Sequence, residues 1–336
     1  MGMNKGFKIS GLLSVTLAAA LMVSSAAARA DTITVDMNSV QGNVNYAGSG
    51  FLHGFNDVTP SSSLITPLKP KLFRTGPANA FKSYARAKSF GIPHLQLALS
   101  DSRAYQAPWP GDNGDWNTWL NLVTNVINQA KANGQTFEWD LWNEPDAGGF
   151  WRASRAQFFE TWTRTFKKVR ELNPSAVIVG PSIANYGDGS WMRAFLLHAK
   201  ATGTLPNILS WHEFDSGGAS FEKDTADVRA FMAQNGINIP RISINEYLGN
   251  NESLPPGVLV DFLAAIGRTK IESAAHSCWP VEAGTTWNCN TFNLDGILTL
   301  PDKQPRAQWW VYKAYADMAG TLVNTTPSVA TIDAIA

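Results

Sequence analysis

Short apolar runs alternate with segments of helical periodicity along almost the whole chain, and this alternation constrains the fold more than any other feature. The apolar runs carry many β-branched and aromatic residues, which favour strands. We expect eight strands, at residues 50–55, 72–75, 94–100, 137–142, 176–179, 208–212, 241–245 and 271–276. Strands that alternate with helices form parallel sheets, and eight of them predict an α/β fold of the (β/α)8 TIM barrel type.

The segments between these runs have apolar residues at helical spacing and recognisable helix ends. The segment 117–134 ends at a glycine, and in the segment 154–174 Ser154 and Gln157 have the spacing of a capping box. Similar patterns occupy residues 225–236, 256–267 and 304–320. An open doubly wound sheet is the structural alternative, but the Gly-rich first turn typical of that fold is absent from this sequence.

Residues 1–30 have the pattern of a secretory signal peptide. Two lysines precede an apolar run over 12–23, and Ala28-Arg29-Ala30 forms a cleavage pattern before Asp31. A transmembrane anchor is the alternative, but the apolar run is too short to span a bilayer and is interrupted by two hydroxyl residues. We therefore expect a secreted or periplasmic protein whose barrel occupies residues 31–320.

The last residues, 321–336, follow the final helical pattern and contain several threonines and valines. This composition favours a strand over a helix. We expect a C-terminal strand segment that begins a β-structured appendage to the barrel, as a truncated β domain would.

Charge and motif content argue against several classes of function. The net charge is zero, 16% of residues are charged and no basic patch stands out, which argues against a nucleic-acid partner. The sequence has no zinc-site spacing, Gly-rich nucleotide loop or nucleophile elbow, so we expect no metal and no cofactor. The 13 tryptophans suit either core packing or the stacking of sugar rings. The two cysteines, Cys278 and Cys289, are expected to form a disulfide in an exported protein.

Polar residues gather at one class of position, the carboxyl ends of the expected strands. This is the edge of a TIM barrel at which active sites lie. The residues are His53, Asn56, Arg74, Asp101, Asn143, Glu144, His212, Glu213, Glu246, Tyr247 and Trp279. Loop charges that only face solvent would scatter, so the pattern predicts a polar pocket at this end of the barrel.

Two of these residues, Glu144 and Glu246, suggest a chemistry for the pocket. Cleaving a glycosidic bond requires one carboxylic acid to protonate the leaving oxygen and one carboxylate to attack or stabilise the anomeric carbon. Carboxyl groups held about 5–5.5 Å apart favour retention of configuration, and their proximity raises the pKa of one of them. Glu138 and Asp140 lie deeper in the same strand as Glu144, where we expect structural pairing, with Arg74 as a partner.

The motifs WNEP at 142–145 and INEY at 244–247 resemble those of clan A retaining glycoside hydrolases. Together with FR at 73–74 and SWHEF at 210–214, they are most similar to glycoside hydrolase family 39 and its relatives, over nearly the whole chain by strand order. The resemblance implies a secreted retaining glycosidase that acts on an extracellular poly- or oligosaccharide. Family members usually carry a β-sandwich beside the barrel, which is absent or cut short in this sequence.

The same resemblance assigns catalytic roles. It makes Glu144 the acid/base and Glu246 the nucleophile. It implies that Asn143 holds the sugar hydroxyl next to the anomeric carbon. Arg74 would orient Glu246, lower its pKa and keep it ionised, and His212 would contact the substrate.

Four further residues are expected to bind substrate. The resemblance places an aromatic floor for the reacting sugar at Trp279, beside the expected disulfide. His53 and Asn56 follow the first strand and are candidates for contact with the sugar. Tyr247 would either hydrogen-bond the nucleophile or pack in the core.

Three alternatives remain open. Strict alternation puts Glu246 on the same face of its strand as Ile242 and Ile244, so Glu213 and Glu252 are substitute nucleophiles. A catalytically silent sugar-binding protein would share the same barrel. A metal-dependent lyase or deacetylase would need a cluster of His and Asp ligands, which no spacing in the sequence indicates.

Overall fold

A computed structural model describes residues 30–103, 105–280, 289–329 and 332–336. Residues 32–336 form one compact unit. Residues 1–29 of the expected signal peptide lie outside the described residues. In the described part of the chain, no helix is both long and apolar enough to cross a membrane.

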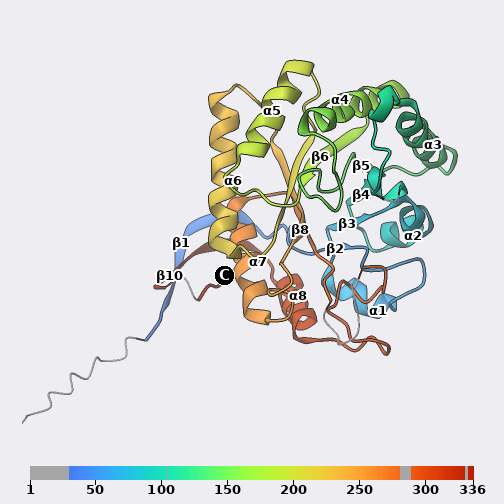
Figure 1. Cartoon of the computed structure of the whole chain (residues 1–336). Coiled ribbons are helices and arrows are strands. Elements are labelled where there is room, and N and C mark those ends of the chain that lie inside the picture. Colours follow the sequence, from blue (N-terminus) through green and yellow to red (C-terminus); the bar gives the residue numbers. More distant parts are fainter. Residues whose placement is uncertain (1–29, 104, 281–288, 330–331) are drawn as a thin grey trace, which may run out of the picture. The chain divides into compact units, whose positions relative to one another are not determined.

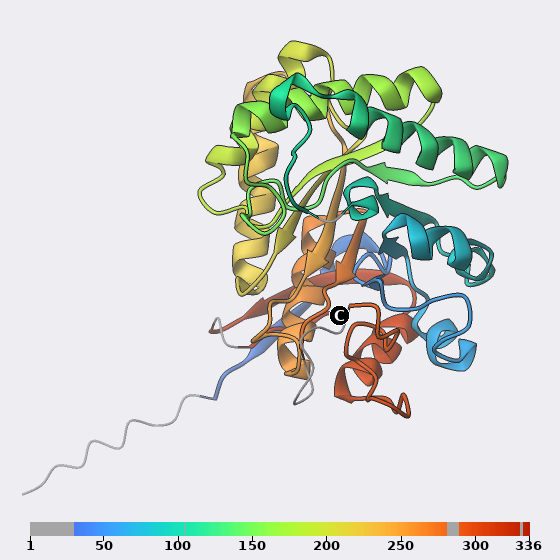
Figure 2. The same cartoon turned by 45° about the vertical axis from the view of Figure 1, so that its right-hand side comes forward.

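Eight parallel strands close into a barrel in sequence order (Figures 1 and 2). They are β2 (Gly50–Leu52), β3 (Leu72–Thr75), β4 (His94–Ala98), β5 (Glu138–Asp140), β6 (Val177–Ile183), β7 (Ile208–Glu213), β8 (Arg241–Tyr247) and β9 (Ser273–His276). Phe51 of β2 pairs with His276 of β9 and closes the barrel. A Cβ atom at Gly50 would lie 2.2 Å from the carbonyl oxygen of Ala274, so this closure requires glycine. The expected (β/α)8 TIM barrel is confirmed, although several strand ends differ from those predicted.

Helices cover the outside of the barrel. They are α1 (Ser62–Ile65), α2 (Pro77–Ser89), α3 (Asn117–Ala132), α4 (Arg155–Leu172), α5 (Ser190–Thr202), α6 (Gly217–Gln234), α7 (Pro256–Thr269) and α8 (Ala307–Asp317). The expected cap is present at the start of α4, where the Ser154 hydroxyl accepts a hydrogen bond from the Gln157 backbone N–H at 3.1 Å. On the inner face of α3, Trp119, Val123 and Ile127 are buried in the apolar core.

The interior of the barrel is polar, in contrast to the apolar layer between strands and helices. Ile178, Leu209 and Ile242 are almost completely buried in that outer layer. Inside, the Gln96 amide donates to Ser243 Oγ at 3.2 Å and to Glu138 at 3.3 Å. These bonds satisfy the Gln96 amide nitrogen, whereas its buried amide oxygen has no hydrogen-bond partner in the described part of the chain.

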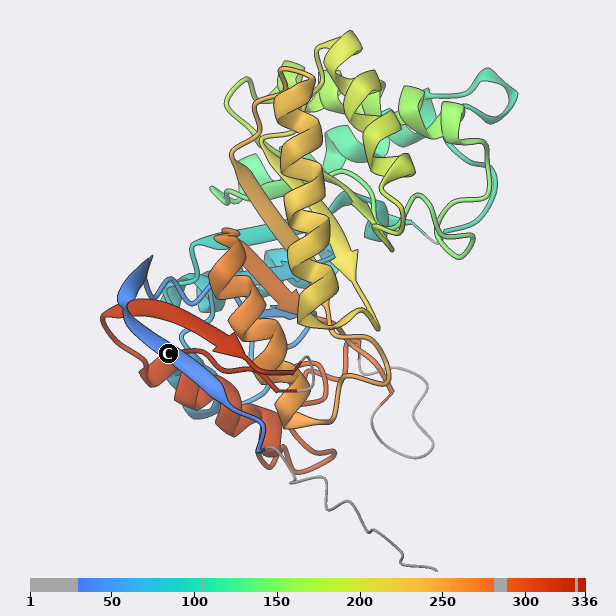
Figure 3. The ribbon, with the colours of Figure 1, turned by 90° about the vertical axis from the view of Figure 1, so that its left-hand side faces the viewer.

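The C-terminal strand predicted from the sequence is β10 (Thr321–Pro327), and it pairs with a strand that was not predicted. β1 (Ile33–Asn43) runs antiparallel to β10 in a separate two-stranded sheet (Figure 3). Met37 is 72% exposed and Val40 is 66% exposed, so β1 has little buried apolar surface. Ile33, Val35 and Met37 alternate with polar residues, so a strand pattern was present in the sequence but was not recognised. The expected barrel region 31–320 therefore begins with a strand that pairs outside the barrel.

Candidate active site

The carboxyl ends of the strands surround a cavity of about 470 Å³. Seven of the eight barrel strands, or the loops that follow them, supply its lining. Among the residues lining it are Arg74, Asn143, Glu144, Glu246 and Trp279, which the sequence analysis had selected. The expectation of a polar pocket at this end of the barrel agrees with the structure.

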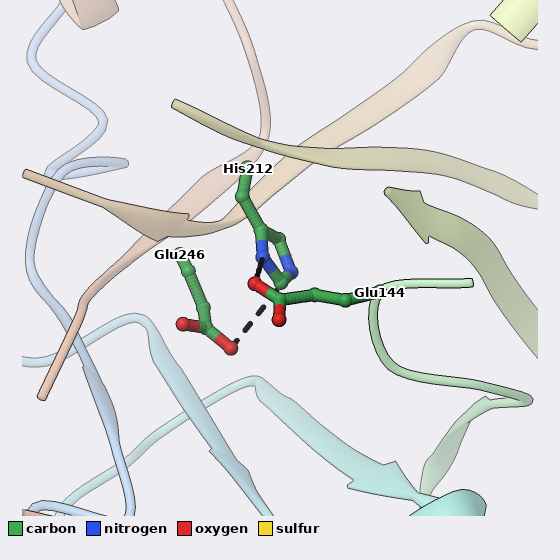
Figure 4. A group of neighbouring side chains, drawn as sticks. All are labelled: Glu144, His212 and Glu246. Atoms are coloured by element: carbon green, nitrogen blue, oxygen red, sulfur yellow. Dashed lines mark hydrogen bonds and ion pairs between the residues drawn. The ribbon is translucent and has the colours of Figure 1, made fainter. Parts of the chain in front are cut away.

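The side chains of Glu144 and Glu246 point toward each other, with His212 beside both (Figure 4). One oxygen of each carboxyl group and one ring nitrogen of His212 all lie within 4.8 Å of one another. His212 Nδ1 lies 2.9 Å from Glu144 Oε1, and His212 Nε2 lies 3.8 Å from Glu246 Oε1. An inverting pair needs room for a water molecule and a carboxyl separation of about 6.5–9.5 Å. The short separation in this cavity favours a retaining arrangement.

Glu144, the fourth residue after the end of β5, is held in a left-handed backbone conformation. Its φ is 49°, a region that residues other than glycine rarely adopt. Its N–H donates to the carbonyl oxygen of Ser182 at 2.9 Å. Asp146, which is exposed, accepts hydrogen bonds from the backbone N–H groups of Ala184 and Asn185. The next strand thus fixes the turn that directs the Glu144 carboxyl group into the cavity.

An irregularity in β8 directs Glu246 into the same cavity. Trp211 of β7 pairs with Ile244, but the next residue, His212, pairs with Glu246, so Asn245 is an extra residue. Asn245 points into the barrel, where its amide donates to Asp140 at 3.1 Å. The extra residue resets the alternation, and Glu246 also faces inward. The concern that alternation would turn Glu246 away is resolved by this bulge.

Arg74 connects the nucleophile candidate to two other side chains. Its Nη1 donates to Glu246 at 2.6 Å, its Nε to Asp140 at 2.8 Å and its Nη2 to Asn143 at 2.7 Å. Arg74 is 1% exposed, and Asp140 and Glu246 together provide the negative charge that a buried guanidinium requires. The expected pairing of Asp140 with Arg74 is present, whereas Glu138 pairs with Arg241 instead.

The two glutamates have different electrostatic surroundings. Burial raises the pKa of Glu144 to about 7, against a smaller downward effect of Arg74. Burial also raises the pKa of Glu246, and this outweighs the downward effects of His212 and Arg74. The expectation that Arg74 gives Glu246 a lowered pKa was therefore wrong in net direction, because the carboxyl group is more deeply buried than expected. Burial lowers the pKa of His212 to about 3, so its ring is neutral near pH 7.

The raised pKa of Glu144 predicts the basic limb of the activity profile. An acid catalyst must be protonated, and its protonated fraction falls as the pH rises through about 7. We expect kcat/KM for an aryl glycoside with a poor leaving group to fall about tenfold per pH unit above that value. Initial rates between pH 4 and pH 9 measure this. In Glu144→Ala, a dinitrophenyl glycoside, which needs no protonation, should show no such limb. If the basic limb persists in Glu144→Ala, a group other than Glu144 causes it.

Three predicted substrate contacts differ from the structure. His212 is completely buried, does not line the cavity and bonds to Glu144 instead. Tyr247 is fully buried, and its hydroxyl donates to the Gly48 carbonyl at 2.7 Å and bonds to the Tyr312 hydroxyl. Tyr247 points away from the cavity because it follows Glu246, which points inward, so the packing alternative is the correct one. Asn56 does not line the cavity, and its side-chain oxygen accepts from the backbone N–H of Thr59 in a local turn.

The two substitute nucleophiles have structural partners. Glu213 accepts from the indole N–H of Trp211 at 2.6 Å and from the Ser216 hydroxyl at 3.0 Å. Glu252 accepts hydrogen bonds from the backbone N–H groups of Asp215, Gly217 and Gly249. Neither carboxyl group lines the cavity, so Glu246 is the one that faces Glu144.

Trp279 forms part of the cavity wall in a fixed orientation. Its indole N–H donates to the Leu248 carbonyl at 2.8 Å, and Phe214 packs edge-on against the ring at 5.2 Å. The expected disulfide between Cys278 and Cys289 is present and also lines the cavity. The segment that it encloses, 281–288, lies outside the described residues. An indole held at one edge and packed by a second ring is suited to stacking against a sugar.

Removing the Trp279 ring should weaken substrate binding more than it lowers turnover. We expect Trp279→Ala to raise KM by roughly 3- to 10-fold, the effect of losing one stacking contact. Steady-state kinetics with the disulfide intact measure this. Trp310→Ala is the control, because Trp310 is 61% exposed on α8 and does not line the cavity. Unchanged KM and kcat in Trp279→Ala would contradict a role as a sugar platform.

Several cavity residues were not assigned a role from the sequence. Asp101 was among the polar residues at strand ends, but Thr75, Asn79 and Tyr105 were not selected. Thr75 and Asn79 lie at the end of β3 and in the first turn of α2, where hydroxyl and amide residues are common. Position alone could have drawn attention to them, since TIM-barrel active sites use these turns.

Glu144, His212 and Glu246 offer three atoms close enough to hold a metal ion. Two features of the site oppose a cation. The guanidinium of Arg74 lies 2.6 Å from Glu246, and Glu144 is protonated below about pH 7. The arrangement therefore fits an acid and a carboxylate acting on a neutral substrate better than a metal centre.

Comparison with known proteins supports the resemblance seen in the motifs, although no protein-family model matches the chain. A 3-O-alpha-D-galactosyl-alpha-L-arabinofuranosidase from Bifidobacterium longum subsp. longum is 24% identical over 96% of the chain. A 3-O-beta-L-arabinopyranosyl-alpha-L-arabinofuranosidase from Bifidobacterium pseudocatenulatum is 25% identical over 92%. The chain spans 34% and 38% of the lengths of these relatives.

Solved structures share the barrel. The structure of N2152 from Neocallimastix frontalis has a TM-score of 0.77 and 27% identity, covering 91% of this chain and 77% of that chain. A monomeric beta-xylosidase from Caulobacter crescentus CB15 has a TM-score of 0.64 at 15% identity, covering 88% and 73%, which shows a common fold. A family 39 beta-xylosidase from Caulobacter crescentus shares it as well. These findings confirm the resemblance to clan A glycoside hydrolases of the family 39 type.

Proposed function

We propose that this chain is a secreted, retaining glycoside hydrolase that cleaves an extracellular poly- or oligosaccharide by double displacement. The observation that carries the proposal is the pair of buried glutamates facing each other across less than 5 Å in one cavity. One of them, Glu144, has a pKa of about 7, and the other, Glu246, is bonded to a buried guanidinium. Such a pair supplies an acid and a nucleophile at the same pH.

In the first step, a Glu246 oxygen attacks the anomeric carbon while Glu144 donates its proton to the leaving oxygen. The glycosidic C–O bond breaks, and a glycosyl ester of Glu246 forms. In the second step, Glu144 takes a proton from a water molecule, whose oxygen displaces the Glu246 carboxylate. Both carboxyl groups then return to their starting protonation states.

Three neighbouring side chains support these steps. The Asn143 oxygen accepts from Arg74 at 2.7 Å, so the amide N–H₂ group is available to donate to the sugar hydroxyl next to the anomeric carbon. Arg74 holds the attacking Glu246 carboxylate in place with a bond of 2.6 Å. His212, neutral and bonded to Glu144 at 2.9 Å, orients the acid without adding a charge.

Substrate and location follow from different observations. Two of the sequence relatives are named as arabinofuranosidases, and a third is named as a beta-xylosidase. Aryl glycosides of arabinofuranose and xylose are therefore the first substrates to test. Export is proposed from the charged start, apolar run and cleavage pattern of residues 1–30, and it suits a polymeric substrate outside the cell.

The test is a screen of 4-nitrophenyl glycosides and polysaccharides for released phenol and reducing ends. Proton NMR of the first product formed from an active substrate should show the same anomeric configuration as the substrate. An inverted first product would rule out double displacement. The second candidate, a silent sugar-binding protein, is favoured if no substrate is cleaved while Glu246→Gln and the unaltered protein bind oligosaccharides equally.

A further inference from the structure

A second polar group in the cavity takes no part in the two-glutamate mechanism. His53, which follows β2, and Asp101, which follows β4, both line the cavity. Their side chains are 16% and 22% exposed, and His53 Nε2 lies 3.8 Å from Asp101 Oδ2. This distance is too long for a direct hydrogen bond. Two partly open polar atoms therefore face each other across a gap.

The partners of the two ring nitrogens of His53 indicate which of them carries the proton. The Asn79 amide nitrogen donates to the Phe55 carbonyl at 2.9 Å and to Thr75 Oγ1 at 3.3 Å. The carbonyl can only accept, so the N–H₂ group of Asn79 must face it. Thr75 Oγ1 accepts from Asn79 and can donate its own proton to His53 Nδ1, 2.8 Å away. We assign the hydrogen of the ring to the other nitrogen, Nε2, because Nε2 faces the Asp101 carboxylate, which can only accept.

Asp101 presents the matching acceptor. Its Oδ1 accepts a hydrogen bond from the Tyr105 hydroxyl, which also bonds to Ser100 Oγ at 2.8 Å. This leaves Oδ2 directed toward His53. Gly76 permits the arrangement, because a Cβ atom there would lie 2.7 Å from the Asp101 Cβ. The carboxylate is thus held by a hydroxyl on one side and open on the other.

We propose that His53 and Asp101 form a subsite for a ring hydroxyl of the substrate and that this subsite selects neutral sugars over uronic acids. A hydroxyl oxygen accepts from His53 Nε2–H and donates to Asp101 Oδ2, and it bridges the gap that the two side chains leave. A sugar carboxylate in the same place has no proton to give to Asp101 and meets a like charge. The inference rests on the proposed glycosidase function and names its substrate class.

The charges around the cavity support this selection. Among the described residues that line it, Arg74 is the only lysine or arginine, and each of its three nitrogens already bonds to protein. The segment 281–288 contains no lysine or arginine in its sequence. Among the described lining residues, a uronic acid carboxylate would therefore find no unpaired cation and would lie near the carboxyl groups of Asp101 and Glu246.

The experiment combines one isosteric variant with altered substrates. Kinetics are measured for the unaltered protein and Asp101→Asn on a neutral aryl glycoside that it cleaves, on the monodeoxy forms of that glycoside and on aryl uronides. Binding of the corresponding unreactive thioglycosides is titrated in parallel. Asp57→Asn is the matched control, because Asp57 is exposed in the loop after β2 and does not line the cavity.

We expect Asp101→Asn to lower kcat/KM for the parent glycoside by roughly 10- to 100-fold, the usual effect of losing a hydrogen bond to a charged group. With the unaltered protein, kcat/KM for one monodeoxy substrate should be lower than for the parent glycoside by about the same factor. For that substrate, Asp101→Asn should lower kcat/KM little further. The uronides should be neither bound nor cleaved by the unaltered protein, and Asp57→Asn should match it throughout.

Two results would overturn the inference. Equal losses on every monodeoxy substrate would make Asp101 a structural residue, and a melting temperature lowered in the same variant would agree with that. Binding or cleavage of uronides at levels similar to neutral glycosides would contradict the selection. The thioglycoside titrations keep the test separate from catalysis. Neutral thioglycosides that bind without any turnover of the parent compounds would refute the proposed function but leave the subsite intact.

Discussion

Glu246→Ala is expected to abolish turnover of every glycoside, with a loss of roughly 10⁵- to 10⁶-fold in kcat, the range known for removing a covalent nucleophile. Glu246 is the carboxyl group that Arg74 orients at 2.6 Å and that faces Glu144 across the cavity. Without it, no glycosyl ester forms, and an activated leaving group does not compensate. Burst and steady-state kinetics with dinitrophenyl glycosides measure the loss.

Added azide distinguishes this variant from the loss of the acid. Glu144→Ala should fail mainly on poor leaving groups, and azide should restore turnover by attacking the glycosyl ester to give a product of retained configuration. In Glu246→Ala, any azide product should be inverted, since the ester never forms. Glu160→Ala on α4 is the control, because the Glu160 side chain is 44% exposed, pairs with Arg164 and does not line the cavity. An inverted azide product from Glu144→Ala would reverse the two assignments.

Arg74→Ala should cost both stability and activity. Removing one partner from a buried ion pair typically lowers the free energy of unfolding by about 3–5 kcal/mol, because the remaining charge stays buried without compensation. Here the loss leaves Asp140, which is fully buried, and Glu246 without their shared cation. Urea unfolding, followed by tryptophan fluorescence, measures this. Arg241→Ala should cost clearly less, because Arg241 is 32% exposed outside the cavity.

The same variant should move the acidic limb of the pH profile. Arg74 lowers the pKa of Glu246, although burial keeps the net shift upward. Its removal raises that pKa further, so Glu246 becomes protonated, and inactive as a nucleophile, at a higher pH. The acidic limb of kcat/KM should therefore shift upward in Arg74→Ala and stay in place in Arg241→Ala. An acidic limb that does not move would mean that it reports another group.

The barrel could be predicted because its strands carry strong local signals. Each barrel strand has apolar residues against the helices, and each helix has an apolar face, so periodicity finds both. β1 was missed although Ile33, Val35 and Met37 alternate with polar residues, a pattern typical of a strand. Its pairing with β10, at the far end of the sequence, could not be predicted, because no local pattern indicates it.

The catalytic pair could be found from strand ends, but the details of the site could not. Glu246 depended on an extra residue in β8, and alternation alone gives no sign of such a bulge. The direction of Tyr247 also depends on this bulge, because Tyr247 follows Glu246 and therefore points to the opposite face of the strand. The relay from Asn79 through Thr75 to His53 joins residues of different elements, and only the closed barrel brings them together.

The pairing of β1 with β10 has a consequence for the order of folding. Almost the whole described chain lies between the two strands, so joining them in an unfolded chain would carry a large loop-closure entropy for little buried apolar surface. A two-stranded sheet is marginally stable by itself. Once the barrel has closed, its two ends already lie close together, where Tyr46 donates to the Met318 carbonyl at 2.7 Å. We therefore expect the sheet to form late in folding, after the barrel has closed, rather than to act as the nucleus of the barrel.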